Sequence, residues 1–292
     1  MNDQTKAGLL ATLIAFFIWG LGPIYFKFLA PATAVEVSMH RAIWACVFVG
    51  LWLAVVGGFA EVRALFLQPR TLALLAISSL LITFNWFAYA WAVMNEQIAQ
   101  ASLGYFISPL INVLLGFVFL QEQFNRLRWI AVGLAALGVL NQVVLVGSVP
   151  LLALSLAFTF GFYGLLRKTV KAEAGPGLFI ETLIVMPFLL VGLLWLETNG
   201  QGHAFNAGWG LPLLLVLGGA LIAIPLFLFS YGARRLNLAT VGLIQYIAPS
   251  MQFGLALWYG ETFGWSQIMT FVLIWSGLAL YTWDMRHQMS LK

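Results

Sequence analysis

The hydrophobic positions of this chain form long stretches, separated by short segments that hold most of the charges and turn residues. A helix needs about 20 apolar residues to cross the hydrocarbon core of a bilayer, and these stretches reach about that length. The pattern therefore predicts ten membrane-spanning helices, with tight hairpins at 94–96 and 147–148. The predicted spans are 7–28, 34–57, 71–93, 98–120, 127–146, 149–169, 178–196, 211–234, 239–259 and 266–285.

The composition excludes a soluble protein. Of the 292 residues, 62% are hydrophobic and 8% are charged, whereas a soluble domain carries about a quarter charged residues. The 24 Phe and 12 Trp residues are typical of helices whose ends sit at lipid–water interfaces. The single cysteine, Cys46, cannot form an internal disulfide and is expected to be a small buried core residue. We therefore predict an all-α integral membrane protein whose partners include the lipid bilayer.

The Lys and Arg residues predict an orientation. With the N-terminus in the cytoplasm, twelve of the fourteen fall in cytoplasmic segments, and only Lys27 and Arg41 do not. The positive-inside rule then places both termini in the cytoplasm. The basic residues are dispersed along the chain, so no nucleic-acid partner is predicted. The twelve are Lys6, Arg63, Arg70, Arg126, Arg128, Arg167, Lys168, Lys171, Arg234, Arg235, Arg286 and Lys292.

The chain also contains a weak internal repeat. The segment 101–109, which ends in Pro109 and is followed by Glu122, is similar to the segment 241–249, which ends in Pro249 and is followed by Glu261. Pairs of equivalent residues also occur elsewhere. They are Gly138 with Gly277, and Trp19-Gly20 with Tyr163-Gly164.

Two repeats of five spans must enter the membrane with opposite polarity, because five is odd. We therefore expect a first repeat at 1–146 and a second, inverted repeat at 147–292. Inverted repeats are frequent in secondary transporters, where the substrate site lies near the midplane between the halves.

Pro109 and Pro249 are each expected about 15 Å along their spans, near the bilayer centre. A proline at that depth frees a carbonyl one turn earlier and kinks the helix. The pair is interpreted as bending elements of alternating access, with ordinary packing kinks as the alternative.

The chain resembles the RarD-type permeases of the drug/metabolite transporter superfamily, the EamA-domain proteins. The resemblance covers nearly the whole sequence and implies two inverted five-helix repeats, which work as a secondary transporter in the bacterial cytoplasmic (inner) membrane. RarD-type members are linked by name to chloramphenicol sensitivity, and related EamA-domain permeases export amino acids and similar metabolites. The resemblance is carried by Phe17–Gly20, Tyr25–Lys27, His40-Arg41, Ile43-Trp44, Asn85-Trp86, Trp91–Val93, Ala101–Phe106, Leu156–Phe158, Phe162–Leu165, Ile180–Thr182 and Gln245–Ile247.

Polar residues within the spans are candidates for function, because an ionisable side chain at the helix centre costs about 2.5–3.5 kcal/mol on insertion scales. Glu36 and His40 share one face of the second span, and Glu36 is a candidate for coupling or gating. Arg41 is suited to bind a substrate carboxylate through two hydrogen bonds. The alternative is an Arg that reaches the head groups beside a structural Glu36–His40 pair. Asn85 suits either a ligand or a hydrogen bond between helices.

Several aromatic and amide groups are expected to line a pocket with His40 and Arg41. Tyr105 and Gln245 are repeat partners near the two prolines, and Tyr246 is adjacent to Gln245. Trp19 and Tyr163 lie too deep for interfacial anchoring, so they either line a pocket or pack in the core. Glu181 is a candidate for carrying a coupling proton, or for pairing with Arg167 or Lys168 across a loop.

No enzyme is predicted. The sequence has no GxxxxGK[ST] phosphate-binding loop, HExxH motif, cysteine cluster or G-x-S-x-G elbow, and its three histidines are far apart in the sequence. No cofactor, metal site or catalytic residue is therefore expected. The prediction is an exporter of small amphipathic metabolites, such as amino acids or drug-like solutes, with a central cavity and alternating access. The rival functions are a membrane-embedded enzyme or lipid-handling protein, and a channel.

Overall fold

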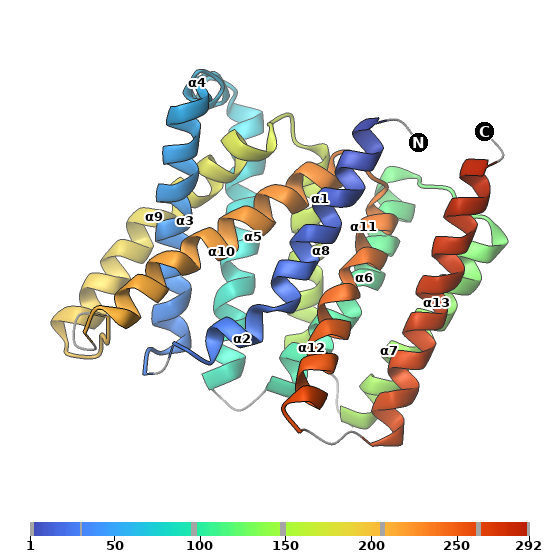
Figure 1. Cartoon of the computed structure of the whole chain (residues 1–292). Coiled ribbons are helices and arrows are strands. Elements are labelled where there is room, and N and C mark those ends of the chain that lie inside the picture. The colour runs from blue at the N-terminus through green and yellow to red at the C-terminus, as the bar shows by residue number, and fades with distance from the viewer. Residues whose placement is uncertain are drawn as a thin grey trace.

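The computed structural model describes residues 3–29, 31–94, 98–146, 150–204, 208–260 and 264–290, and these residues form thirteen helices (Figure 1). Eight crossings of the membrane are single helices: α3 (Ala34–Val56), α5 (Pro69–Met94), α6 (Ile98–Leu120), α7 (Arg126–Val146), α8 (Leu151–Thr169), α9 (Ala174–Thr198), α10 (Gly210–Ala233) and α13 (Trp265–Ser290). The first crossing combines α1 (Asp3–Gly20) with α2 (Gly22–Phe26), and the ninth combines α11 (Leu238–Gln245) with α12 (Ile247–Trp258).

The ten crossings confirm the predicted all-α fold of two inverted five-helix repeats. Among the described residues, eight crossings are long and apolar enough by composition to span a membrane. The ninth is interrupted at Tyr246, and the tenth carries several polar residues along α13. The hairpins predicted at 94–96 and 147–148, and Glu261 of the internal repeat, lie outside the described residues except for the backbone of Met94. The boundary between 1–146 and 147–292 stays a prediction.

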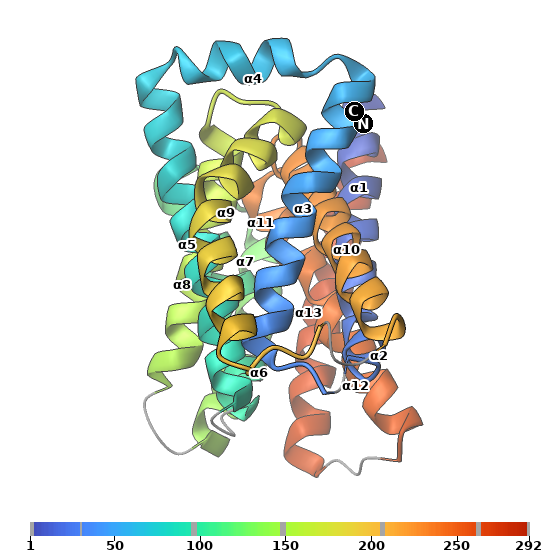
Figure 2. The same ribbon diagram turned by 90° about the vertical axis from the view of Figure 1, so that its left-hand side faces the viewer.

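Successive crossings alternate in direction, so both termini lie at the same end of the bundle (Figures 1 and 2). We call this the terminal end and the opposite one the distal end. The short helix α4 (Phe59–Phe66) lies across the terminal end, between α3 and α5 (Figure 2). It buries Val62 and Leu65 and exposes Phe59 and Phe66. This pattern is typical of a helix that lies in the plane of the membrane interface.

The inverted symmetry is visible where α7 packs along α13, at the right-hand side of Figure 1. A Cβ atom on Gly138 of α7 would lie 2.9 Å from the carbonyl oxygen of Thr270 in α13. A Cβ atom on its repeat partner, Gly277 of α13, would lie 2.6 Å from the carbonyl oxygen of Ala131 in α7. In lipid, helices associate through such close backbone contacts rather than through the hydrophobic effect. The two glycines therefore bring the two helices together at equivalent places.

Gly277→Ala is expected to destabilise the protein by about 1–3 kcal/mol, because the new methyl group would meet backbone atoms of α7 that cannot move alone. The matched control is Gly133→Ala on α7, where a Cβ atom meets nothing within 4 Å. That change should be neutral or stabilising by up to about 1 kcal/mol, because Ala favours helix more than Gly. Denaturation of both variants in detergent micelles measures the difference. Equal stability of the two variants would contradict the close contact.

Candidate functional site

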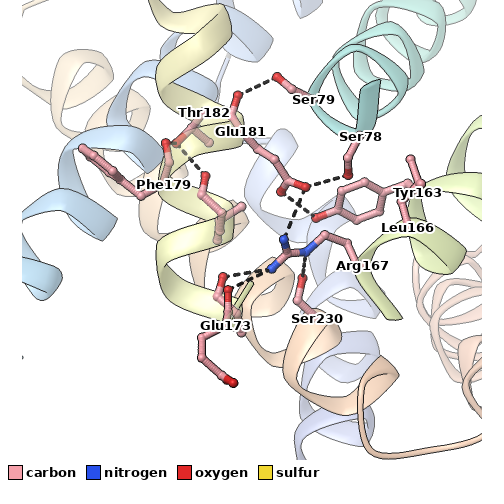
Figure 3. A network of polar contacts seen from close by, with 12 residues as sticks. Ser78, Ser79, Tyr163, Leu166, Arg167, Glu173, Phe179, Glu181, Thr182 and Ser230 are labelled. Carbon is pink, nitrogen blue, oxygen red and sulfur yellow. Dashed lines mark hydrogen bonds and ion pairs between the residues drawn. The ribbon is translucent and has the colours of Figure 1, made fainter. Parts of the chain in front are cut away.

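A buried ion pair joins α8 to α9 toward the terminal end of the bundle (Figure 3). Nη1 of Arg167 lies 3.5 Å from Oε1 of Glu181, and the side chains are 0% and 1% exposed. Both charges are removed from solvent, so each depends on the other and on nearby dipoles for compensation. The sequence left open whether Glu181 carries a coupling proton or pairs with Arg167 or Lys168. In the structure its partner is Arg167.

Side chains from two further helices complete this network (Figure 3). From α5, Ser78 Oγ donates to Oε1 of Glu181 at 2.6 Å, and Ser79 Oγ donates to the Glu181 backbone oxygen at 2.6 Å. From α10, Ser230 Oγ accepts from Nε of Arg167 at 3.0 Å. The hydroxyl of Tyr163 donates to Oε2 of Glu181 at 3.5 Å. Ser78 and Ser79 precede residue 146 and the other members follow it, so the network connects the two predicted repeats.

The guanidinium of Arg167 is held in one place by the backbone of α9. Its Nη2 donates to the carbonyl oxygens of Glu173, at 3.4 Å, and Ala174, at 3.1 Å. A Cβ atom on Gly177 would lie 2.3 Å from Nη1. Glycine at 177 therefore lets the guanidinium pass so close to α9, and no pattern in the sequence indicated this.

Two more charges hold the linker between α10 and α11. The carboxylate of Glu122 accepts from the backbone N–H groups of Leu238, at 2.5 Å, and Ala239, at 3.0 Å, at the start of α11. Nζ of Lys168 donates to the backbone oxygens of Ala233, the last residue of α10, and Leu236 in the linker. Each charge has the sign that suits the helix end it contacts. Sequence reasoning did not assign a role to Glu122, although its recurrence with Glu261 in the internal repeat was a usable signal.

Arg41 lies toward the distal end, on α3, among aromatic side chains. The phenol groups of Tyr25, Tyr89 and Tyr105 are close enough to interact with its charge. Its guanidinium carbon lies 5.1 Å from the ring centroid of Phe26. Nε of Arg41 is buried without a hydrogen-bond partner. Within the described ranges, no carboxylate forms an ion pair with Arg41. Arg41 therefore has a buried donor without a partner and a positive charge that no carboxylate in the described ranges pairs with.

Glu36 contacts a loop far along the chain. Its Oε1 accepts from the backbone N–H groups of His203, at 2.8 Å, and Ala204, at 3.0 Å. Its Oε2 lies 3.0 Å from Nδ1 of His203. Thr33 and Glu36 also form a capping box at the start of α3. Glu36 thus ties α3 to the loop after α9, and His40, one turn further along, lies beside it.

Asn85 and Gln245 connect helices. Nδ2 of Asn85 on α5 donates to the backbone oxygen of Leu156, at 2.8 Å, and to Oγ1 of Thr159, at 2.9 Å, on α8. Gln245 on α11 donates through Nε2 to Ser108 Oγ at 2.9 Å. It also accepts from Asn112 Nδ2 at 3.0 Å. Of the two alternatives considered for Asn85, this geometry supports the hydrogen bond between helices.

Trp19 and Tyr163, which occupy equivalent positions in the repeat, meet in one aromatic cluster. Phe229 stands between them, with its ring centroid 6.0 Å from that of Trp19 and 5.9 Å from that of Tyr163. Tyr163 is fully buried, while Trp19 is half-buried. Tyr246 is also fully buried, and its hydroxyl donates to the Phe106 backbone oxygen at 3.1 Å. Core packing accounts for Tyr163 and Tyr246 here.

The prolines affect their helices unequally. Pro249 stands four residues after Gln245, where α11 ends, whereas α6 continues through Pro109. A third proline, Pro23, stands four residues after Trp19, close to the break between α1 and α2. The Trp19 backbone oxygen accepts from Gln252 Nε2 of α12 at 3.4 Å, so a neighbouring helix satisfies the carbonyl that Pro23 frees. The interrupted crossings, first and ninth, pack against each other.

The predicted site residues therefore fall into separate groups. Arg41 and Tyr105 lie together, as do Glu181 and Tyr163, and Glu36 lies with His40. An open pocket of about 240 Å³ lies elsewhere, lined by the apolar residues Leu13, Ile14, Phe17 and Ile247 of α1 and α12. Its lining offers no polar group for a lipid head group. The central cavity of the sequence prediction stays a prediction.

The sequence and the fold of this chain are both similar to those of known proteins. The model of the EamA-like transporter family matches residues 6–142 and again residues 147–283. Protein RarD of Salmonella typhi is 43% identical over 282 residues, which cover 96% of each chain. An uncharacterised transporter of Vibrio cholerae is 43% identical over 285 residues, covering 97% of this chain and 94% of the relative. A solved crystal structure superimposes with a TM-score of 0.71 at 19% identity, over 96% of this chain and 98% of that one. That likeness concerns the fold.

Proposed function

This chain belongs to the EamA-like transporter family, and from that membership we propose that it exports small amphipathic metabolites carrying a carboxylate, such as amino acids, by alternating access. That the protein is a multi-pass membrane transporter, and not an enzyme, follows from the family itself. The substrate class, the direction and the mechanism belong to the proposal. Arg41 is the observation that carries it.

A half-buried arginine with no anionic partner in the described part of the chain is costly in a membrane protein unless it serves function. Its planar guanidinium presents paired donors that match the two oxygens of a carboxylate. Tyr89 and Tyr105 stand beside it with ring centroids 5.8 Å apart, which adds apolar surface and hydroxyl groups. An amphipathic solute could place its carboxylate against Arg41 and its apolar part against the rings of Tyr89 and Tyr105.

Alternating access requires that one end of the pathway closes while the other opens. The network around Arg167 and Glu181 joins α5, α8, α9 and α10 toward the terminal end, so it is suited to close that end. Opening there would have to separate Glu181 from Ser78 across the predicted repeats. We propose Glu181, Pro109 and Pro249 as gating residues on this basis.

The terminal end is proposed to face the cytoplasm of a bacterial cell. It holds Lys6, Arg63, Arg128, Lys168 and Arg234, as the positive-inside rule requires. The relatives are bacterial, which supports the cytoplasmic membrane. This orientation is tested by fusing green fluorescent protein to the C-terminus. The fused protein matures only in the cytoplasm, so fluorescence would support a cytoplasmic C-terminus.

Counterflow in proteoliposomes tests the substrate proposal. Vesicles are loaded with one unlabelled solute and the uptake of the labelled form is followed. The panel pairs each amino acid or other carboxylate with its amide. At least one carboxylate should show a transient overshoot and its amide should not, because the amide lacks the charge that pairs with Arg41. A channel would give no overshoot. Failure of every carboxylate with folded protein, or equal overshoot with the amides, would contradict the proposal.

A further inference from the structure

Four side chains gather at the distal end, and we call them the distal cluster: Glu36, His40, Glu197 and His203. One carboxylate oxygen of Glu36, one ring nitrogen of His40 and one carboxylate oxygen of Glu197 all lie within 4.8 Å of one another. Nδ1 of His203 adds to these, 3.0 Å from Oε2 of Glu36. Two of the three histidines in the chain thus meet at one carboxylate, although they lie 163 positions apart in the sequence.

Two atoms of the distal cluster lack partners. Nε2 of His40 is buried without a hydrogen bond, on a side chain that is 7% exposed. Oε1 of Glu197 is likewise buried without a hydrogen bond. A buried polar atom without a partner destabilises the fold, because it has lost its hydrogen bonds to water without replacement. A ligand that satisfies both atoms at once would remove that destabilisation.

The loop after α9 holds the cluster in shape. Gly200 has a left-handed backbone with φ of 70° and turns the chain back toward α9. A Cβ atom on Gly202 would lie 2.3 Å from the carboxyl carbon of Glu197, so glycine leaves room for that carboxylate. The backbone N–H groups of His203 and Ala204 fix Oε1 of Glu36, and Oε2 remains toward the histidine ring. The Glu36 carboxylate is thus held in position by hydrogen bonds, in the way that metal ligands are held by the groups around them.

We propose that the distal cluster binds a divalent transition-metal ion of the zinc class. His40, Glu36 and Glu197 supply one nitrogen and two oxygens, which are ordinary zinc ligands. In a tetrahedral site with bonds of about 2.0–2.1 Å, neighbouring ligand atoms stand about 3.4 Å apart. The atoms now lie within 4.8 Å of one another, so side-chain rotations that bring them closer would give that spacing. Water fills the fourth position, and His203 supports the Glu36 ligand through its contact with Oε2.

Such an ion would join the two predicted repeats at the distal end. Glu36 and His40 belong to α3, before residue 146, whereas Glu197 and His203 belong to the end of α9 and the loop that follows it. The side chain of His203 is 36% exposed, which gives the ion a path from solvent. If the two repeats move during transport, an ion that joins them should slow substrate exchange, and this expectation rests on the proposed function. The binding of zinc itself does not rest on it.

The test uses the full chain in detergent micelles, purified through a tag without histidine. Isothermal titration with ZnCl₂ should show about one ion per chain, and the melting temperature should rise with zinc concentration because the ion binds the folded state. MgCl₂ at the same concentrations should do neither, because magnesium prefers oxygen ligands in octahedral geometry. Zinc binding that is absent or as weak as that of magnesium would overturn the proposal.

Variants then locate the ion. His203→Ala should lower zinc affinity by about 10–100-fold, as losing a supporting partner typically does. His40→Ala and Glu197→Gln should lower it further, because each removes a ligand. His287→Ala, at the far end of α13, is the matched control and should bind zinc as the natural chain does. All variants are first compared for melting temperature without zinc. Folded His40→Ala and Glu197→Gln proteins that bind zinc unchanged would overturn the proposal.

Discussion

Glu181→Leu is expected to destabilise the protein by about 3–5 kcal/mol, because it leaves the charge of Arg167 buried without an anionic partner. Arg167 is fully buried, and the oxygens that would remain near it, from Ser230, Glu173 and Ala174, carry only partial charges. Unfolding of the purified protein by SDS in mixed micelles measures the loss.

A double-mutant cycle separates the ion pair from its surroundings. Arg167→Met alone should also cost several kcal/mol, whereas the double variant should lose clearly less than the sum of the single losses, because it buries no charge. The matched control is Glu173→Gln, which removes the ion pair with Arg234 at the membrane surface. There Glu173 is 54% exposed, and the cost should stay below about 1 kcal/mol. Strict additivity of the Arg167 and Glu181 losses would show that the two charges do not depend on each other.

Arg41→Ala is expected to weaken binding of the best carboxylate substrate at least about 30-fold, which corresponds to about 2 kcal/mol. The alanine removes both the charge and the paired donors, and among the described residues Arg41 is the basic group that interacts with Tyr89 and Tyr105. Arg41→Lys should recover part of the affinity, because an ammonium keeps the charge but not the planar pair of donors. Concentration dependence of counterflow gives the apparent affinities.

Lys27 provides the control for Arg41. It is also a basic residue toward the distal end, but it is exposed and lies over the ring of Tyr259, with Nζ 3.0 Å from the centroid. Lys27→Met should leave substrate affinity unchanged. If Arg41→Ala and Lys27→Met behave alike while both proteins are folded, Arg41 does not bind the carboxylate.

The sequence was sufficient for the fold because the bilayer imposes strong constraints. A crossing needs a long apolar segment, so the ten spans follow from the positions of charges and turns. The repeat was detectable through Gly138 and Gly277, whose shared role is a close contact between α7 and α13. Such a contact leaves no room for a side chain, so it requires glycine at both positions, and this can be recognised in the sequence.

The pairing of polar groups was harder to predict, because it depends on how each helix is rotated and on partners far along the chain. The sequence predicted that Glu36 faces His40 on its own helix, and the two do lie together, but it did not predict the hydrogen bonds that Glu36 accepts from His203 and Ala204. From the sequence, Asn85 was equally suited to bind a ligand or to form a hydrogen bond between helices. The structure shows that it donates to the backbone oxygen of Leu156. Periodicity gives the face of a helix that is polar, but not which neighbour it meets.

The contact between Glu122 and the start of α11 has a consequence for biogenesis. The carboxylate leaves the ribosome 116 residues before its partner Leu238. At about 5–20 residues per second, it waits roughly 6–23 s for that partner. Glu122 follows the end of α6 rather than lying inside it, so during this delay it can remain hydrated at the membrane surface. The first repeat can thus be inserted completely by the translocon before the second supplies its capping N–H groups.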